Sequence, residues 1–169
     1  SLIILKHPIM RHCITLFLAA SLTVTTALAQ ILTGSVTNLG NENIDLTVVV
    51  DVANNSVTLT MEGPNSKWFG VGFGSSNMSG AYTMHVSATP FQMNERAHGG
   101  NGQGTILSSS GAVTNDVSSG SRRTVSFTRP RVGPNSNYYT FPNTAGSIPV
   151  IWANGNSLGY GYHNNNRGN

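Results

Sequence analysis

Two side chains, one near the middle of the sequence and one near its end, could bind a single metal centre. Met78 lies in the glycine-rich stretch 68–81, and His163 lies in the aromatic and glycine-rich stretch 160–163 near the end of the chain. A thioether and an imidazole form the axial pair that holds low-spin haem iron in electron-transfer cytochromes. Because the two residues are far apart in the sequence, only a tertiary fold could bring them to one iron. The pair therefore predicts a site for haem.

Each of these residues also has an ordinary structural explanation. A methionine often fills a gap in an apolar core, but Met78 lies among Asn, Ser and Gly rather than in an apolar run. His163 could be a surface histidine, and His85 and His98 are the alternatives to it. We expect His98, which lies in a glycine-rich loop sequence, to be exposed to solvent. Met84 or His85 is the second choice as a ligand.

The neighbours of His163, namely Tyr160, Gly161 and Tyr162, could flank a flat macrocycle and favour His163 over the other histidines. Glycine admits close approach of the backbone, and a tyrosine ring offers an apolar face with a polar tip. The sequence supports no Ser–His–Asp arrangement, catalytic carboxylate pair or phosphate-binding loop, so no catalytic residue is predicted. The predicted metal ligands are Met78 and His163, and the predicted cofactor-binding residues are Met78, His163, Trp68, Phe73, Tyr160 and Tyr162.

Residues 1–29 are typical of a few upstream residues followed by a secretory signal peptide. Met10 starts a short basic segment, residues 13–22 form an apolar run, and Ala-Leu-Ala at 27–29 matches a cleavage pattern. We therefore expect residues 30–169 to form a secreted, extracellular domain, or a periplasmic one if the source is bacterial. The lone cysteine, Cys13, lies in the leader, so neither a disulfide nor covalently attached c-type haem is expected.

The composition argues against two classes of function. Lys and Arg total 9 and Asp and Glu total 6, and this small basic excess does not predict binding to nucleic acid. No segment after the leader approaches the roughly 18 apolar residues of a membrane span, so no span is expected. Four basic residues close in sequence are expected to form a solvated face: Arg122, Arg123, Arg129 and Arg131.

The sequence from residue 30 onward is predicted to be all β. Residues 44–52 and 57–62 are rich in β-branched residues and alternate between apolar and polar, as half-buried antiparallel strands do. Short apolar runs separated by Gly, Asn, Ser and Pro indicate a β-sandwich. Further strands are expected at 68–73, 82–88, 105–107, 124–128, 148–153 and 158–163. The expected buried residues include Val48, Val50, Leu59, Phe73, Val125, Phe127 and Ile151.

An ordered set of motifs resembles the DOMON domain family. The motifs are Trp-x-Gly-x-Gly-Phe at 68–73, Met-x-Gly-Ala at 78–81, Phe-x-Arg-Pro at 127–130, Trp-Ala at 152–153 and Tyr-His at 162–163. The resemblance implies an immunoglobulin-like antiparallel β-sandwich of about ten strands. Some members bind haem b through a Met and a His, as in the cytochrome domain of cellobiose dehydrogenase and in plant apoplastic b-type cytochromes. The sequence departs from the family at Tyr82, where Asp is common.

These observations predict a secreted b-type haem domain that carries single electrons by outer-sphere transfer. Its partner would be a redox protein or a small-molecule electron donor or acceptor, and the domain would be no enzyme by itself, although it could serve as a module of a larger redox enzyme. An extracellular carbohydrate-binding module is the alternative, and a structural surface protein is a weaker one. The aromatic residues that could stack on sugars are Trp68, Trp152, Tyr138, Tyr139, Tyr160 and Tyr162.

Overall fold

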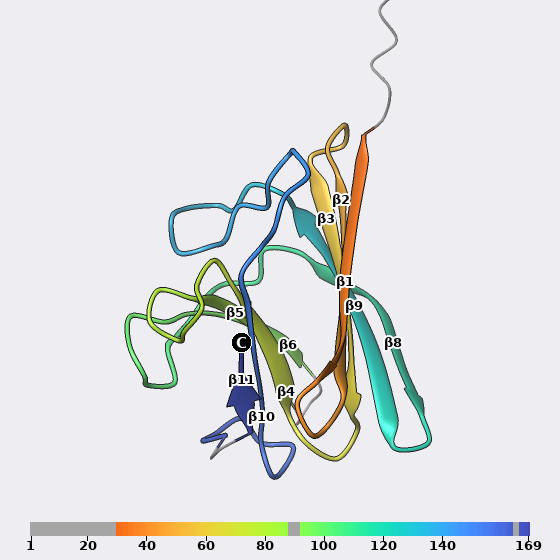
Figure 1. Ribbon diagram of the computed structural model, residues 1–169, viewed down its shortest axis with the longest axis vertical. Helices are drawn as coiled ribbons and strands as arrows, with labels where there is room; N and C mark the ends of the chain where they lie inside the picture. Colours follow the sequence, from red (N-terminus) through yellow and green to blue (C-terminus); the bar gives the residue numbers. More distant parts are fainter. Residues whose placement is uncertain (1–29, 88–91, 164–165) are drawn as a thin grey trace, which may run out of the picture.

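Strands joined by turns and loops make up the described chain, which in the computed structural model comprises residues 30–87, 92–163 and 166–169. These residues contain no helix, so none of them forms a membrane-spanning helix. Two antiparallel sheets face each other as a sandwich (Figure 1), which confirms the predicted fold class. The predicted signal peptide lies outside the described residues.

The first sheet has five strands in the order β1-β2-β3-β9-β8, so β1 and β8 form its edges. All four neighbouring pairs are antiparallel. The strands are β1 (Ile31–Leu39), β2 (Ile44–Asp51), β3 (Ser56–Pro64), β8 (Ala112–Ser119) and β9 (Arg122–Pro130).

The second sheet has six strands in the order β11-β10-β4-β5-β6-β7, with β4 and β5 at its centre. The chain enters it at β4 and returns to it through β10 and β11 close to the C-terminus (Figure 1). The strands are β4 (Phe69–Phe73), β5 (Tyr82–Ser87), β6 (Gln92–Ala97), β7 (Thr105–Ile106), β10 (Val150–Asn154) and β11 (Arg167–Gly168).

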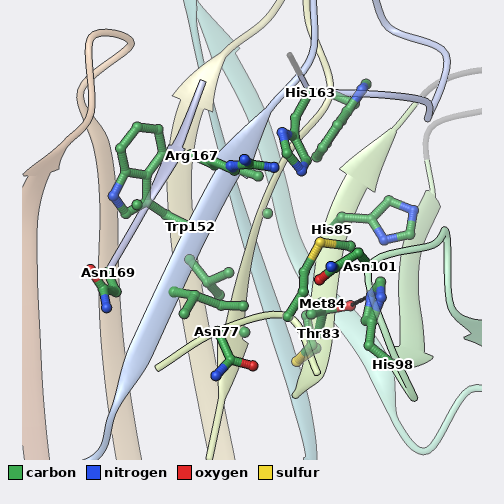
Figure 2. A pocket seen from close by; sticks show the side chains of 18 of the residues that line it. Asn77, Thr83, Met84, His85, His98, Asn101, Trp152, His163, Arg167 and Asn169 are labelled. Carbon is green, nitrogen blue, oxygen red and sulfur yellow. Dashed lines mark hydrogen bonds between the residues drawn. The ribbon is translucent and has the colours of Figure 1, made fainter. Parts of the chain in front are cut away.

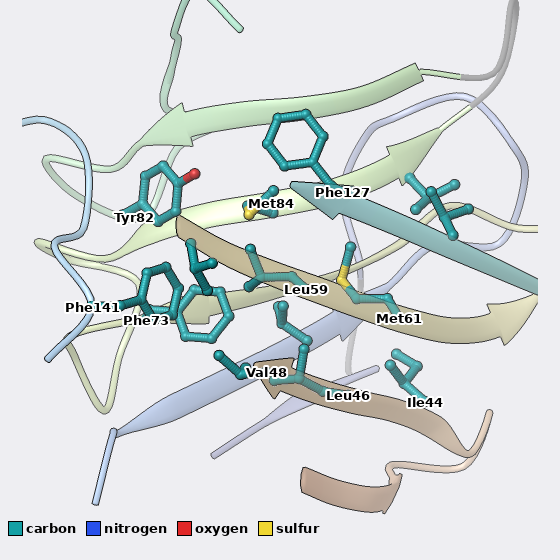
Figure 3. Close-up of a cluster of buried hydrophobic side chains, with 14 of the residues drawn as sticks. Ile44, Leu46, Val48, Leu59, Met61, Phe73, Tyr82, Met84, Phe127 and Phe141 are labelled. Atoms are coloured by element: carbon teal, nitrogen blue, oxygen red, sulfur yellow. The ribbon is translucent and has the colours of Figure 1, made fainter. Parts of the chain in front are cut away.

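Strands β2 and β3 show how the sequence builds the core. Buried and half-buried residues alternate along both, because successive side chains of a strand point to opposite faces. Leu46 lies opposite Met61, and Leu59 lies opposite Val48 on one side and Phe127 on the other. These pairs form an apolar layer that packs against the second sheet (Figure 3). All seven residues that the sequence predicted to be buried are buried: Val48, Val50, Leu59, Phe73, Val125, Phe127 and Ile151.

A buried ion pair links the two sheets. Arg129 of β9 and Glu95 of β6 are each 2 % exposed, and the Arg129 Nε and Glu95 Oε1 atoms are 4.0 Å apart. Glu95 also accepts hydrogen bonds from the Ser110 backbone N–H (2.6 Å), the Ser110 hydroxyl (2.6 Å) and the Tyr82 hydroxyl. The expectation of a solvated arginine face is therefore wrong for Arg129, and also for Arg123, which is 4 % exposed.

The strand predictions were incomplete where the pattern of burial is weak. Most residues of β1 and all residues of β8 are exposed, so neither strand shows the alternation that marks a half-buried strand. The short strands β6 and β11 were not predicted either. Conversely, residues 158–163 form no strand. That segment runs along a pocket, where the side chains of Tyr160 and His163 pack instead of joining a sheet.

Candidate functional site

A pocket of about 560 Å³ has its floor on the outer face of the second sheet. Gly70 and Gly72 of β4 line it, while their neighbours Phe69, Val71 and Phe73 belong to the core, with Val71 also bordering the pocket. A Cβ atom at Gly70 would lie 2.6 Å from the Cβ of His85, and one at Gly72 would lie 2.7 Å from a side-chain carbon of Ile151. The glycines therefore leave a floor without side chains.

Three segments form the walls, and they bring the two predicted ligands together. The loop 74–81 contributes Met78, the loop 98–104 contributes Asn101, and the C-terminal segment contributes His163. Figure 2 shows His85, His98 and His163 around the same space. Met78 is half-buried and His163 is buried. Their action as metal ligands stays a prediction, but the fold does place both in one pocket.

His98 is buried rather than exposed, which corrects the prediction. Its Nδ1–H donates to the Gly102 carbonyl (3.1 Å), so a neutral ring accepts a hydrogen bond from the Thr83 hydroxyl at Nε2 (3.0 Å). Its backbone carbonyl accepts from the Gly80 N–H (2.7 Å), and its N–H donates to the Ala81 carbonyl (3.0 Å). His98 therefore joins its own loop to the segment that carries Met78. Burial lowers the pKa of His98.

His85 lies on the pocket floor with a neutral ring. It packs on Tyr160, with ring centroids 4.0 Å apart and planes 26° from parallel, and edge-on to Trp68. Burial, with smaller contributions from Arg96 and His98, lowers its pKa from 6.5 to about 3. The Nδ1 atom of His85 has no hydrogen-bond partner among the described residues. Its neighbour Met84, the other second choice as a ligand, is fully buried in the core cluster and also borders the pocket.

Aromatic side chains surround these histidines. Trp68 is buried beside Tyr160, with ring centroids 4.9 Å apart, and both line the pocket. Tyr162 packs on the ring of His163 at 5.2 Å and is 72 % exposed, so it forms part of the rim. Phe73 does not line the pocket, contrary to its predicted role. It faces inward because its position on β4 differs by an odd number of residues from that of the floor glycines.

The pocket also contains residues that the sequence analysis missed. Thr83, His98 and Asn101 add polar groups near the Met78 loop, and Arg167 adds a positive charge near His163. A basic residue shortly after His163 was the available sequence signal for Arg167. Over residues 30–87, 92–163 and 166–169, no three His, Cys, Asp or Glu side chains gather into a metal-binding cluster.

No protein-family model and no curated protein sequence matches this chain. Among solved structures, the chain is similar to the cytochrome domain of cellobiose dehydrogenase from Myriococcum thermophilum, with a TM-score of 0.54 and 11 % sequence identity. The similarity covers 82 % of this chain and 79 % of that domain. It establishes the fold. At this identity it does not by itself carry a ligand or an activity from one protein to the other.

Proposed function

We propose that this protein is a haem-binding domain that carries single electrons, with Met78 and His163 as its iron ligands. The observation that carries the proposal is the meeting of these two residues in one pocket, although they lie far apart in the sequence. The similarity of the fold to a cytochrome domain supports it.

The residues of the pocket fit haem b in size and chemistry. The volume of about 560 Å³ is within the roughly 300–1,000 Å³ typical of ligand and cofactor pockets. A thioether and an imidazole are a known axial pair, and the rings of Trp68 and Tyr160 offer apolar faces to a macrocycle. When bound, haem would supply reversible one-electron chemistry.

The protein's own residues would hold, orient and shield the cofactor. Met78 and His163 would hold the iron, and the thioether would favour its ferrous state and raise the reduction potential relative to two histidines. The hydrogen bonds of His98 would hold the Met78 loop in place. The glycine floor at Gly70 and Gly72 gives the space, because any side chain there would collide with its neighbours.

Such a site fits an electron carrier that works outside the cytoplasm. With both axial positions taken by protein, transfer would be outer-sphere, to a redox protein or to a small-molecule donor or acceptor. The domain would then have no enzyme activity of its own, although it could supply electrons within a larger enzyme. The signal-peptide pattern of residues 1–29 supports a secreted location.

One observation favours a carbohydrate-binding alternative. The pocket contains amide side chains beside its aromatic rings, and both kinds of group can contact sugars. Trp152 and Tyr162 line this pocket, as that alternative requires, but Tyr138 and Tyr139 pack in or against the core and are not available. The amides are Asn77, Asn101 and Asn169.

An absorption spectrum of the full chain, expressed with a supply of haem, tests the proposal. A Soret band with a six-coordinate low-spin spectrum is expected. His163→Ala should abolish that spectrum and weaken haem retention, because the imidazole ligand is lost. Met78→His should retain haem with a lower reduction potential, because imidazole stabilises ferric iron better than a thioether does. Colourless protein that binds glycans would instead support the alternative.

Two further variants control the assignment of the ligands. Met93→Leu changes a methionine that packs against the core and does not line the pocket, so its spectrum should match that of the wild type. His85→Ala removes the rival histidine. If His85→Ala abolishes the low-spin spectrum while His163→Ala leaves it intact, the ligand assignment is wrong even though the protein binds haem.

A further inference from the structure

The acidic residues of the protein all lie away from the pocket. The sequence has six Asp and Glu residues, all within the described residues, and none of them lines the pocket. Five have cationic partners, and the sixth accepts hydrogen bonds within a turn. The contacts are Glu42 with Lys67, Asp45 and Glu62 with Arg122, Glu95 with Arg129, Asp116 with Arg123, and Asp51 with Asn54.

Arg167, in contrast, gives the pocket a positive charge. Among the residues that line the pocket it is the one Lys, Arg, Asp or Glu. It lies opposite Ala153 in the β10–β11 register, and opposed residues of antiparallel strands project from the same face. Ala153 lines the pocket too. Figure 2 shows Arg167 beside the space that His163 also borders.

The guanidinium of Arg167 is available to a ligand. The side chain is exposed, and within the described part of the chain it has neither an ion-pair nor a hydrogen-bond partner. Arg96 lies nearby, with its Cζ 4.3 Å from the centre of the Tyr160 ring. Its Nη1 donates to the carbonyls of Gln103 (3.0 Å) and Gly104 (3.3 Å), so Arg96 adds positive charge but is already engaged.

We infer that Arg167 recognises a carboxylate of the pocket's ligand and makes the site selective for anionic over neutral ligands. The planar guanidinium matches a carboxylate in a two-pronged, charge-assisted hydrogen bond, and no acidic residue in the pocket competes for it. The inference deepens the proposed function and rests on it: with haem bound, the carboxylate is a propionate. A uronic acid would present the same chemistry if the ligand is a sugar.

A comparison of haem with its dimethyl ester separates carboxylate recognition by Arg167 from haem binding as such. The ester keeps the iron and the macrocycle but has no carboxylate. The dissociation constants of both compounds are measured by spectroscopic titration of the full chain, for the wild type, Arg167→Gln and Arg167→Lys. Arg122→Gln removes an equal charge from a strand of the first sheet that does not line the pocket, and is the control for net charge. Wild type and Arg122→Gln should prefer haem over the ester by roughly tenfold, the effect of one charge-assisted contact.

In Arg167→Gln the ratio of the dissociation constants of the ester and of haem should fall to about one, while the low-spin spectrum of the haem complex is kept. Arg167→Lys should restore part of the preference for haem. An unchanged preference in Arg167→Gln would overturn the inference. If neither compound binds to the wild type, the proposed function fails. The binding of glucuronate oligosaccharides is then compared with that of glucose oligosaccharides in the same four proteins. Loss of glucuronate binding in Arg167→Gln would still support carboxylate recognition, whereas no binding of glucuronate to the wild type would overturn it.

Discussion

Acidification from pH 7 to pH 5 should destabilise the protein chiefly through His85. The unfolded chain takes up a proton on this ring near pH 6.5, whereas the folded protein resists it until about pH 3, because the ring is buried and Arg96 and His98 are close. The folded state therefore binds fewer protons between these two values. The contribution of His85 to stability is complete above about pH 6.5 and declines as the pH falls toward 3.

The size of the effect follows from the two pKa values. Each unit between the unfolded-state pKa and the working pH costs about 1.4 kcal/mol of unfolding free energy. From 6.5 down to pH 5 the loss is therefore about 2 kcal/mol, a large part of the roughly 5–15 kcal/mol of a typical domain. Carboxyl groups, with ordinary pKa values of roughly 4, stay largely ionised at pH 5. The change in stability between pH 7 and pH 5 therefore comes mainly from histidines.

Urea unfolding of the full chain without added haem, at pH 7 and at pH 5, measures this loss. His85→Phe is the matched variant, because a phenyl ring can keep the stacking on Tyr160 and cannot take a proton. We expect the wild type to lose about 2 kcal/mol between the two pH values and His85→Phe to lose less than half as much. The remainder would come from His98, whose pKa is also lowered. Equal losses in the two proteins would refute the reasoning.

Two further predictions concern the buried polar groups. Arg129→Met should lower the free energy of unfolding by about 3–5 kcal/mol, because it leaves the buried Glu95 without its cation. Adding Glu95→Leu should recover much of that loss. If the loss of the double variant in urea unfolding equals the sum of the two single losses, the two residues are not coupled. His98→Ala should cost roughly 1–3 kcal/mol and lower the low-spin fraction of haem-loaded protein, because His98 holds the loop of Met78. An unchanged spectrum in His98→Ala would show that the loop does not need this residue.

The core strands could be predicted because burial imposes a period of two on their sequence. β2 alternates between buried and half-buried residues throughout, and β3 does so up to Gly63, so Leu46, Val48 and Leu59 identify their own buried face. β8 has no such face, since every residue in it is exposed. It forms because β9 offers a free edge, and hydrogen bonding to an edge requires no particular side chains. A strand that forms in this way shows no alternation of apolar and polar residues in its sequence.

The residues of the candidate site also differ in how well the sequence predicts them. Met78 and His163 could be chosen as candidates because their side-chain chemistry is distinctive, and the fold places both in one pocket. The glycines of β4 were noted as part of a motif but were not predicted to form the floor. His98 was misjudged because its glycine-rich neighbours resemble a solvated loop, whereas its ring is buried by hydrogen bonds to Thr83 and Gly102 that join distant parts of the chain. The sequence alone does not show such contacts.

The alternation of β4 explains how a pocket of this size can coexist with a stable core. Phe69, Val71 and Phe73 fill the space between the sheets from one face of the strand, while Gly70 and Gly72 leave the other face bare. Val71, Met84 and Trp152 border both the core and the pocket, so the two are adjacent but are filled mainly by different side chains. The same separation places Glu95 between the sheets and Arg167 at the pocket. The protein can thus keep its acidic groups for stability and present a neutral to basic pocket to its ligand.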